Sequence, residues 1–316
     1  MAGYALQRTL AIIPVVLVVT LVIFGLVRFS PGDPAAIIAG PYADAEMIDA
    51  IRTKMGLDRP LIIQLGMWYK QILTGDLGDS LFGKEKVWSL IQARLIPTIS
   101  LAMYTNVFAV VLAIPIGVLA AWKVNSWIDR LVMLLSTLGF SIPLFWLGFM
   151  LMIAFALKIP ILPVAGYVSP SENVGEYFRY LVMPVVTTGV AVLSLIARMT
   201  RATVLETLNE DYIRTARAKG LAESTVLIKH ALRNALLPII TIVGIGFGLL
   251  LGGVVVTENV FAIPGLGRLL VNAITHRDYP IIQGTVLLLA GVYAFVNLLV
   301  DLSYAYLDPR IRYGGT

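Results

Sequence analysis

The chain has 316 residues, of which 58% are hydrophobic and 14% are charged, with a net charge of +5 and a mean hydropathy of +0.86. A soluble domain usually has about 25% charged residues, so this composition favours a protein dissolved in the lipid bilayer over a soluble enzyme or binding domain. No basic domain with interleaved aromatic residues is present to bind nucleic acid, and the absence of cysteine excludes disulfides, thiolate metal sites and cysteine nucleophiles.

Six apolar segments are each long enough to cross a hydrocarbon layer of roughly 30 Å as an α-helix. The first is too long for the core of a signal peptide, and no small-residue cleavage site follows it, so we expect it to be retained. Six spans predict an all-α membrane protein with both termini on one side. The predicted spans are 9–29, 97–122, 131–157, 180–197, 235–256 and 281–306.

The sequence predicts three regions: 1–29 with the first span, an extramembrane segment 30–96, and a five-helix core 97–316 that includes the loop 198–234. The segment 30–96 is expected to contain turns and two short helices. Its Gly78-x-x-x-x-Gly83-Lys84 spacing resembles the start of a phosphate loop. However, a magnesium-binding Ser or Thr is missing after the lysine and no strand precedes the motif, so a turn-rich loop is favoured.

Lysine and arginine in the short loops predict the orientation, because long loops such as 30–96 are discounted. The side expected to be cytoplasmic has 12 basic residues, namely Arg8, Lys123, Arg130, Arg198, Arg201, Arg214, Arg217, Lys219, Lys229, Arg233, Arg310 and Arg312. The other side has 4, namely Lys158, Arg179, Arg268 and Arg277. Both termini and the loop 198–234 are therefore expected in the cytoplasm.

The stretch 205–238 has a helical pattern that a simple connection between two spans does not need. Asn209 is placed as an N-cap with two acidic residues after it, and Gly220 is placed to end the helix. Small residues such as Ala216 would let a partner approach closely. We therefore expect a partner outside the membrane to bind the helix 209–220, the alternative being a basic loop that contacts anionic lipid.

A transport path needs polar or unwound positions inside the bundle, because polar groups that face lipid are costly. Ser141 and Pro143 are expected to interrupt the third span, where exposed carbonyls line a cavity or the helix is only kinked. Asp301 is the only acid well inside a span, and pairing with a neighbouring helix is favoured over contact with a substrate ammonium. The candidate path residues are Asn106, Ser141, Pro143, Gly248, Asn297 and Asp301.

Several motifs occur in a fixed order along the chain. DYIRTARAKGL at 211–221 is followed by KHALRNALLP at 229–238, and TENVFAIPGLGRLL occupies 257–270. Together with PGDP after the first span, GDLGDS, and GFSIPLFWLG at 139–148, they resemble the permease subunits of bacterial ABC importers, in the dipeptide, oligopeptide and nickel branch. Arg214 stands where the general importer pattern has Glu, which matches the variant in that branch.

This resemblance implies a type I ABC importer permease whose EAA loop forms a coupling helix that docks on a cytoplasmic ATPase. The docking residues would be Tyr212, Arg214, Ala216, Arg217, Lys219 and Gly220. The implied partners are a second homologous permease in a heterodimer, two ATP-binding subunits that hold ATP and Mg, and an extracytoplasmic binding protein. The complex would lie in the bacterial inner membrane. The loop facing the binding protein would include Glu258, Asn259, Pro264, Gly265 and Gly267.

Two other classes of function are weighed against this one. A stand-alone ion-coupled transporter would need a convincing intramembrane charged site and internal repeats, whereas the sequence has one peripheral Asp301 and no clear repeat. A membrane enzyme is disfavoured because His230 and His276 are expected on opposite sides of the membrane and no hydrolase motif is present. The chain is thus expected to have no catalytic residue and no metal or cofactor of its own. Among substrates, di- and oligopeptides are favoured, and glutathione and nickel chelates stay open.

Overall fold

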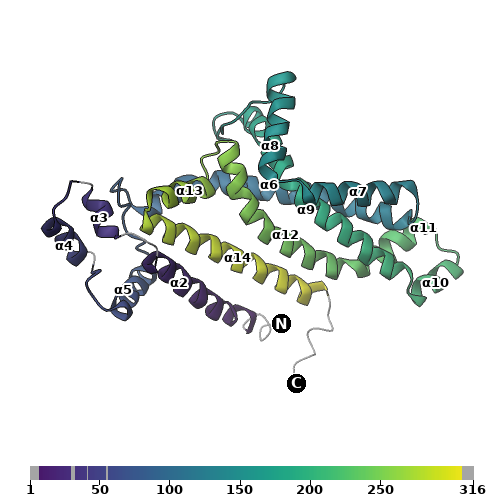
Figure 1. The fold of residues 1–316 in the computed structure, drawn as a ribbon. Coiled ribbons are helices and arrows are strands. Elements are labelled where there is room, and N and C mark those ends of the chain that lie inside the picture. Colours follow the sequence, from purple (N-terminus) through teal and green to yellow (C-terminus); the bar gives the residue numbers. More distant parts are fainter. Residues whose placement is uncertain (1–6, 30–32, 41, 55, 308–316) are drawn as a thin grey trace. The chain divides into compact units, whose positions relative to one another are not determined.

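The computed structural model describes residues 7–29, 33–40, 42–54 and 56–307. In this part of the chain the regular structure is helical, apart from an isolated bridge between Asp79 and Lys86 (Figure 1). The all-α membrane fold expected from the sequence is confirmed. The predicted cytoplasmic ends, 1–6 and 308–316, lie outside the described residues.

The α-helices, with two π-helices named η, are α2 (Ile12–Phe29), α3 (Pro34–Ala39), α4 (Ala45–Lys54), α5 (Leu61–Leu73), α6 (Val87–Trp122), α7 (Trp127–Ser141), α8 (Leu144–Met152), η1 (Ile153–Lys158), α9 (Val174–Leu208), α10 (Asp211–Ala218), α11 (Glu223–Thr225), η2 (Val226–Leu232), α12 (Arg233–Val260), α13 (Leu266–His276) and α14 (Tyr279–Leu307).

Five helical stretches among the described residues are long and apolar enough to cross a membrane. A pair of helices joined at a bend gives a sixth span if the pair is counted as one. The pair is Trp127–Ser141 and Leu144–Lys158, which meet at 101° within the third span expected at 131–157. The break falls at Ile142, whose backbone is extended, as is usual for a residue before proline. The interruption was predicted at this place, and the structure makes it a sharp corner.

The helices extend beyond the apolar segments that predicted them. The helix α6 begins at Val87 and includes Pro97, so the last part of the expected extramembrane segment 30–96 is helical and continues into the second span. Similarly, α9 covers Val174–Leu208 where the apolar run covers only 180–197. Hydropathy marks the part of a helix that lies in lipid, whereas the helix itself continues through its polar ends.

The described residues form two compact units. The first unit comprises residues 7–9, 97–264 and 295–307, and the second comprises residues 10–96, with its gaps, and 265–294. One boundary of this grouping falls after residue 96, as in the expected division, whereas the described residues of 10–29 and 265–294 belong to the same unit as the segment 30–96.

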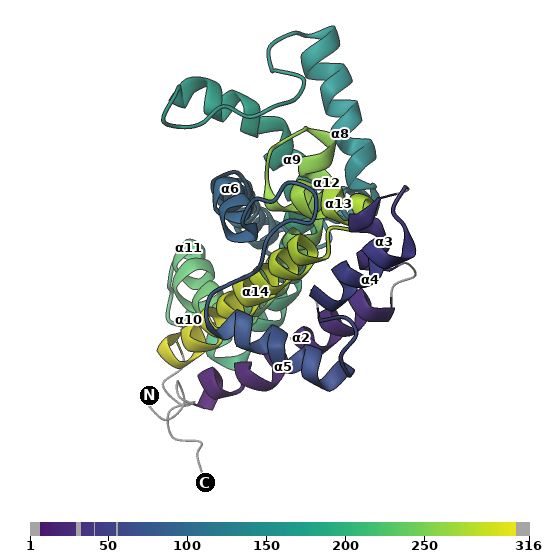
Figure 2. The same cartoon turned by 90° about the vertical axis from the view of Figure 1, so that its left-hand side faces the viewer.

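In the first unit α9 is the central helix, and it lies beside both α7 and α12 (Figures 1 and 2). Close approach requires small residues: a Cβ at Gly117 of α6 would come within 2.6 Å of the Ala197 carbonyl oxygen on α9. Alanine, valine and isoleucine fill the space between these helices, with Ala109, Ala113, Val192, Ile196, Ala197 and Leu250 forming one buried cluster.

In the second unit α5 packs against α2, and polar bonds fix the turn-rich loop before α6. The hydroxyls of Thr20 and Tyr69 are 2.7 Å apart, and the ring centroids of Phe24 and Trp68 are 5.8 Å apart. The loop 74–86 is held by Asp278, whose carboxylate accepts hydrogen bonds from a serine hydroxyl at 2.6 Å and a backbone amide at 3.2 Å. The favoured interpretation of this loop as a structural turn is thereby supported.

Candidate partner-docking loop

The loop between α9 and α12 contains a short amphipathic helix. The helix α9 ends at Leu208, and Asn209 is its C-cap, with the side-chain amide donating to the Leu205 carbonyl at 3.0 Å. The prediction that Asn209 begins the next helix was therefore wrong: Glu210 is the N-cap, and α10 covers Asp211–Ala218. Asparagine suits either end of a helix, so the sequence did not distinguish the end of α9 from the start of α10.

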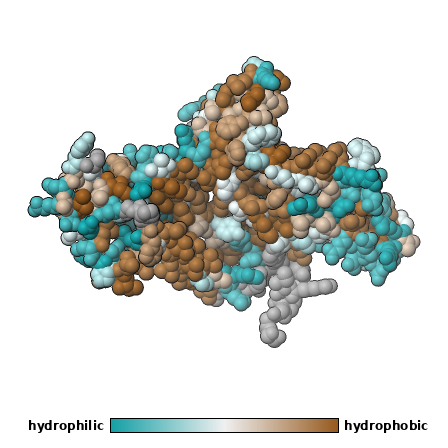
Figure 3. Space-filling model, viewed as in Figure 1, coloured by the Kyte–Doolittle hydropathy of each residue, from teal (hydrophilic) through white to brown (hydrophobic). Residues whose placement is uncertain are grey.

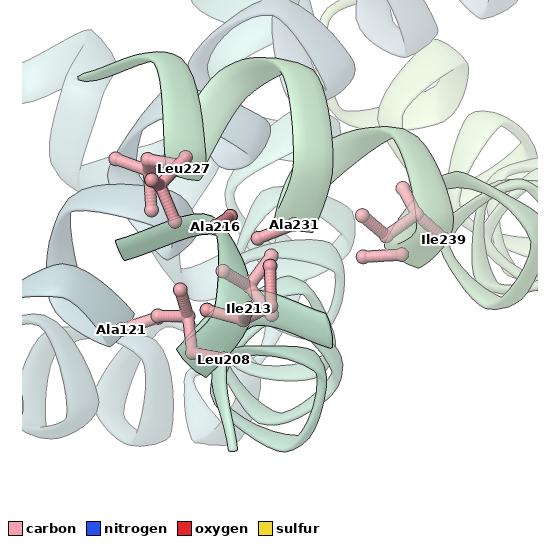
Figure 4. Packing of buried hydrophobic residues seen from close by; sticks show 10 residues of the cluster. Ala121, Leu208, Ile213, Ala216, Leu227, Ala231 and Ile239 are labelled. Atoms are coloured by element: carbon pink, nitrogen blue, oxygen red, sulfur yellow. The ribbon is translucent and has the colours of Figure 1, made fainter. Parts of the chain in front are cut away.

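One side of α10 is buried against the chain itself. Ile213 is fully buried and Ala216 is 7% exposed, and the two lie three residues apart on the same side of the helix. Figure 4 shows both within a cluster that includes Leu208 and Leu227 from the neighbouring helices. Ala216, which was expected to contact a partner, therefore anchors α10 to its own subunit. The small side chain allows close packing inside the chain.

The opposite side of α10 is exposed and charged. Tyr212, Arg214, Arg217 and Lys219 all reach solvent, and hydrophilic residues gather around the α10–α11 end in Figure 3. Arg214 forms an exposed ion pair at 3.1 Å with Asp211, one turn before it, and such pairs contribute little to stability. The exposed face of the helix can therefore exchange its contacts for those of a partner at low cost.

The turn after α10 is closed by main-chain and side-chain bonds. Gly220 has φ +73°, and its amide donates to the Arg217 carbonyl at 2.9 Å, while the Leu221 amide reaches the Ala216 carbonyl at 3.4 Å. This is the pattern of a Schellman cap, so Gly220 ends the helix as predicted. Nothing in the described structure lies within 4 Å of a Cβ placed on Gly220, so the glycine is required by the backbone angle.

A two-pronged ion pair braces the same turn. The Arg217 guanidinium donates to both carboxylate oxygens of Glu223, with N–O distances of 2.6 and 3.2 Å. The hydrogen-bonded carboxylate raises the pKa of Arg217 above its ordinary value. On the other side of α10, the Asn234 amide donates to the Tyr212 hydroxyl at 2.7 Å. These bonds join the exposed face of α10 to α11 and to the start of α12.

Sequence reasoning included Ile213, Glu223 and Asn234 in the loop 198–234 but did not identify them as residues that hold α10 in place. Glu223 lies six residues after Arg217 and across a glycine turn, so the spacing of three or four residues that marks pairs on one helix does not reveal it. Asn234 meets Tyr212 across 22 residues. Only Ile213 left a signal, as the single large apolar residue in a short polar helix.

The predicted path residues lie on several helices of the first unit. Asn106, Gly248 and Asn297 are half-buried on three different helices, and Ser141 and Pro143 are exposed at the corner between α7 and α8. The corner is therefore an exposed, broken part of the third span, and the remaining positions stay predictions.

Asp301 has a partner on another segment of the first unit. Its Oδ2 lies 3.4 Å from Nη1 of Arg8, and both side chains are partly exposed. The structural interpretation of Asp301, which was favoured over contact with a substrate, is thus supported. In the part of the chain that the structure describes, no group of three His, Asp or Glu residues could hold a metal ion.

The outer-loop prediction needs a correction. Glu258 is completely buried in α12, where it accepts a hydrogen bond from the Thr98 hydroxyl at 2.5 Å, so it does not face a binding protein. Gly265 and Gly267 are buried as well. Asn259 and Pro264 are exposed and stay available for such a contact. The sequence predicted that Glu258 lies in an outer loop, whereas α12 continues to Val260 and buries the Glu258 side chain.

Comparison with known proteins agrees with these features. A family model described as the inner membrane component of binding-protein-dependent transport systems matches residues 113–313, and a model of the N-terminal part of such components matches residues 1–102. The chain is 46% identical over 313 residues to the probable peptide ABC transporter permease protein y4tP of Sinorhizobium fredii. This alignment covers 99% of the chain and all of the relative.

Two further relatives match at the same coverage. They are the glutathione transport system permease protein GsiC of Salmonella typhimurium, at 44% identity over 313 residues, and the dipeptide transport system permease protein DppB of Alkalihalophilus pseudofirmus, at 39% over 333 residues. In both cases 99% of this chain and 100% of the relative are aligned. The chain therefore belongs to the inner-membrane components of binding-protein-dependent transport systems, and it is a multi-pass permease subunit of the peptide-importer type of ABC transporter.

Proposed function

We propose that this chain is one of two different permease subunits of an ATP-driven importer for di- or oligopeptides. The names of its relatives support this substrate class, since they refer to peptide, dipeptide and glutathione transport. An extracytoplasmic binding protein delivers the substrate, and exposed Asn259 and Pro264 are the residues suited to contact it. ATP and Mg are held by two partner subunits, and this chain contributes no catalytic residue.

The loop around α10 is the part that couples the permease to those ATPase subunits. The observation that supports this role is the two-sidedness of α10: Ile213 and Ala216 fix it to the first unit, while Arg214 and Lys219 are exposed. ATP binding can move the permease only if the two conformations differ in their contacts with this loop or its partner. A helix fixed on one side and free on the other can transmit such a difference into α12.

The test compares two substitutions of nearly equal shape at Gly220. Asparagine and aspartate both tolerate the left-handed backbone better than other residues with a side chain, so Gly220→Asn is the matched control for Gly220→Asp. We expect ATP-dependent peptide uptake into proteoliposomes to fall roughly tenfold in the aspartate variant, because a charge buried without a partner costs more than about 1.4 kcal/mol. The asparagine variant should keep most of the uptake.

Co-purification is measured on the same variants. Recovery of a second permease and ATPase subunits with the unmodified chain, and loss of the ATPases in Gly220→Asp, would support the proposal. Equal uptake and equal ATPase recovery in both variants would remove α10 from the coupling contact. Uptake by this chain alone without ATP would overturn the importer assignment as a whole.

A further inference from the structure

The second unit contains a cavity of about 310 Å³ between the end of α2, α5, the loop before α6 and the start of α14. This volume lies at the lower end of the range for small-ligand sites. The cavity wall is mixed, with apolar residues such as Trp68 and Ile72 beside several polar side chains. All its lining residues belong to the second unit, so the site is described within one compact body.

Arg28 at the end of α2 contributes a half-buried cation to the lining of this cavity. Its Nε atom is buried and has no hydrogen-bond partner among the described residues. Its guanidinium lies 5.2 Å from the ring centroid of Phe24 one turn earlier, which holds the side chain in place without neutralising it. Buried donors are nearly always satisfied, so an unpaired guanidinium nitrogen beside a cavity indicates a missing acceptor.

Gln64 of α5 adds a second unsatisfied atom to the same cavity. Its side chain is 7% exposed, and its amide nitrogen donates to the carbonyls of Leu57 and Arg59 at 3.2 and 2.7 Å. These two bonds fix which end of the amide is the oxygen, and that Oε1 is buried without a partner. The cavity lining thus includes a buried acceptor atom on Gln64 and a buried donor atom on Arg28, both without a partner among the described residues.

Two carboxylates lie at the exposed side of the cavity. Asp76 and Asp79 line it, and both residues are exposed. One oxygen of Asp76 accepts a hydrogen bond from the Gly78 amide at 2.9 Å, which orients that carboxylate. A ligand with an inner anion and an outer cation therefore meets opposite charges at both ends, whereas a simple anion meets repulsion at the entrance.

We propose that this cavity binds a zwitterion, with its anionic oxygens on Arg28 and its ammonium group beside Asp76 and Asp79. Two sources offer this chemistry: the headgroup of phosphatidylethanolamine and a free peptide. The surroundings favour the lipid. The span that ends near Arg28 has only 17% of its apolar window buried within this chain, so most of its surface is open where lipid can reach it, and hydrophobic residues cover that surface in Figure 3. Trp68 is a side chain typical of the level of the headgroups.

The experiment measures lipid that stays bound to the full-length chain, purified in mild detergent with whatever subunits accompany it. The protein is first incorporated into vesicles of equal phosphatidylethanolamine and phosphatidylglycerol, then extracted, washed and examined by mass spectrometry. We expect retained phosphatidylethanolamine to fall about tenfold in Arg28→Gln, because a charge-assisted hydrogen bond is lost. Arg59→Gln, an exposed arginine outside the cavity lining, is the matched control and should retain the lipid.

Two further variants keep the test decisive if Arg28→Gln folds poorly. Ile72→Trp should fill the cavity and expel the lipid while Arg28 keeps its charge. Asp76→Asn combined with Asp79→Asn should reduce the preference for phosphatidylethanolamine over phosphatidylglycerol, since only the former has an ammonium group. Thermal unfolding in detergent verifies that each variant is folded.

The outcomes separate the two sources and do not depend on the proposed transport function. Loss of the lipid in Arg28→Gln or Ile72→Trp, with retention in Arg59→Gln, supports a lipid site. A dipeptide that binds the detergent-washed protein in an Arg28-dependent manner, without retained lipid, keeps the zwitterion site and rejects the lipid source. Equal retention of phosphatidylethanolamine in Arg28→Gln, Ile72→Trp and the unmodified chain overturns the proposal.

Discussion

The carboxylate of Asp129, in the first turn of α7, accepts hydrogen bonds from both Nε and Nη2 of Arg201 on α9, the latter at 2.7 Å. The side chains are 5% and 20% exposed, so this pair lies largely away from water. The same carboxylate accepts a third hydrogen bond, from the Asn125 backbone amide at 3.0 Å. The pair thus ties the loop after α6 to the helix that leads into α10.

Removing one partner of this pair leaves a largely buried charge. Arg201→Gln is expected to destabilise the protein by up to about 3 kcal/mol, because the Asp129 carboxylate loses its counter-charge. Arg201→Gln combined with Asp129→Asn should recover part of the loss. Thermal unfolding in detergent measures both effects. Asp211→Asn, which removes the exposed partner of Arg214, is the control and should shift the melting temperature little. A single variant as stable as the control would show that the pair is not needed.

The pair between Arg217 and Glu223 is expected to be required for coupling. Arg217→Gln should lower peptide-stimulated ATP hydrolysis by the assembled transporter several-fold, because the turn after α10 loses its brace. Lys229→Gln removes a basic charge from an exposed residue outside α10 and serves as the control. The charge-swapped variant Arg217→Glu with Glu223→Arg should restore part of the activity. A defect in Lys229→Gln as large as that in Arg217→Gln would show that coupling does not depend on this ion pair.

The absence of cysteine makes the orientation directly testable, since single-cysteine variants need no background substitutions. With Lys70→Cys, a membrane-impermeant maleimide should react in intact spheroplasts. With Lys219→Cys, it should react only after the membrane is opened. The expectation follows from the excess of basic residues in the short loops on the side of Lys219. Labelling in the opposite order would invert the topology.

Burial distinguishes two adjacent residues at the end of α12. A cysteine at Asn259 should be labelled from outside and should cross-link to the binding protein, because Asn259 is exposed. A cysteine at Glu258 should stay unlabelled in the folded protein, because Glu258 is completely buried. The measurement is the ratio of cross-linked product between the two variants in the presence of binding protein and substrate. Similar cross-linking of both would contradict the corrected position of Glu258.

The helices α3 and α4, which are expected to lie outside the membrane, should loosen in acid. Partial burial raises the pKa of Asp33, but hydrogen bonds from Arg52 at 2.5 Å and the Ala35 amide at 3.0 Å outweigh this and hold the pKa below its ordinary value. A lowered folded-state pKa contributes stability that is present above the unfolded pKa of about 3.9 and is lost as the pH falls through the folded value.

Limited proteolysis with pepsin between about pH 5 and pH 2 measures this effect. Cleavage between α3 and α4 should increase with falling pH in the unmodified chain, after correction for protease activity. The Asp33→Asn variant should be cleaved readily throughout, because its amide cannot form the charged bond to Arg52. Asp58→Asn is the control and should follow the unmodified chain. A flat profile for the unmodified chain would show that the Asp33–Arg52 pair does not hold these helices together.

Hydropathy and motif order determined the class of this protein, the number of its apolar segments and the position of the break before Pro143. Local signals also placed Gly220 at the end of α10, because a left-handed backbone at a helix end favours glycine. Such features depend on residues close together in the sequence, and one sequence is enough to reveal them.

The tertiary structure decided which side of each helix is buried and which distant residues meet. It turned Ala216 and Glu258 inward, and it paired Arg217 with Glu223 across a turn. It also brought Arg28 and Gln64, from separate helices, to the wall of one cavity. These contacts join residues that are far apart in the sequence, so no periodic pattern within one segment predicts them. The free energies of burial and of ion pairing depend on those contacts, and they are therefore decided only when the segments pack together.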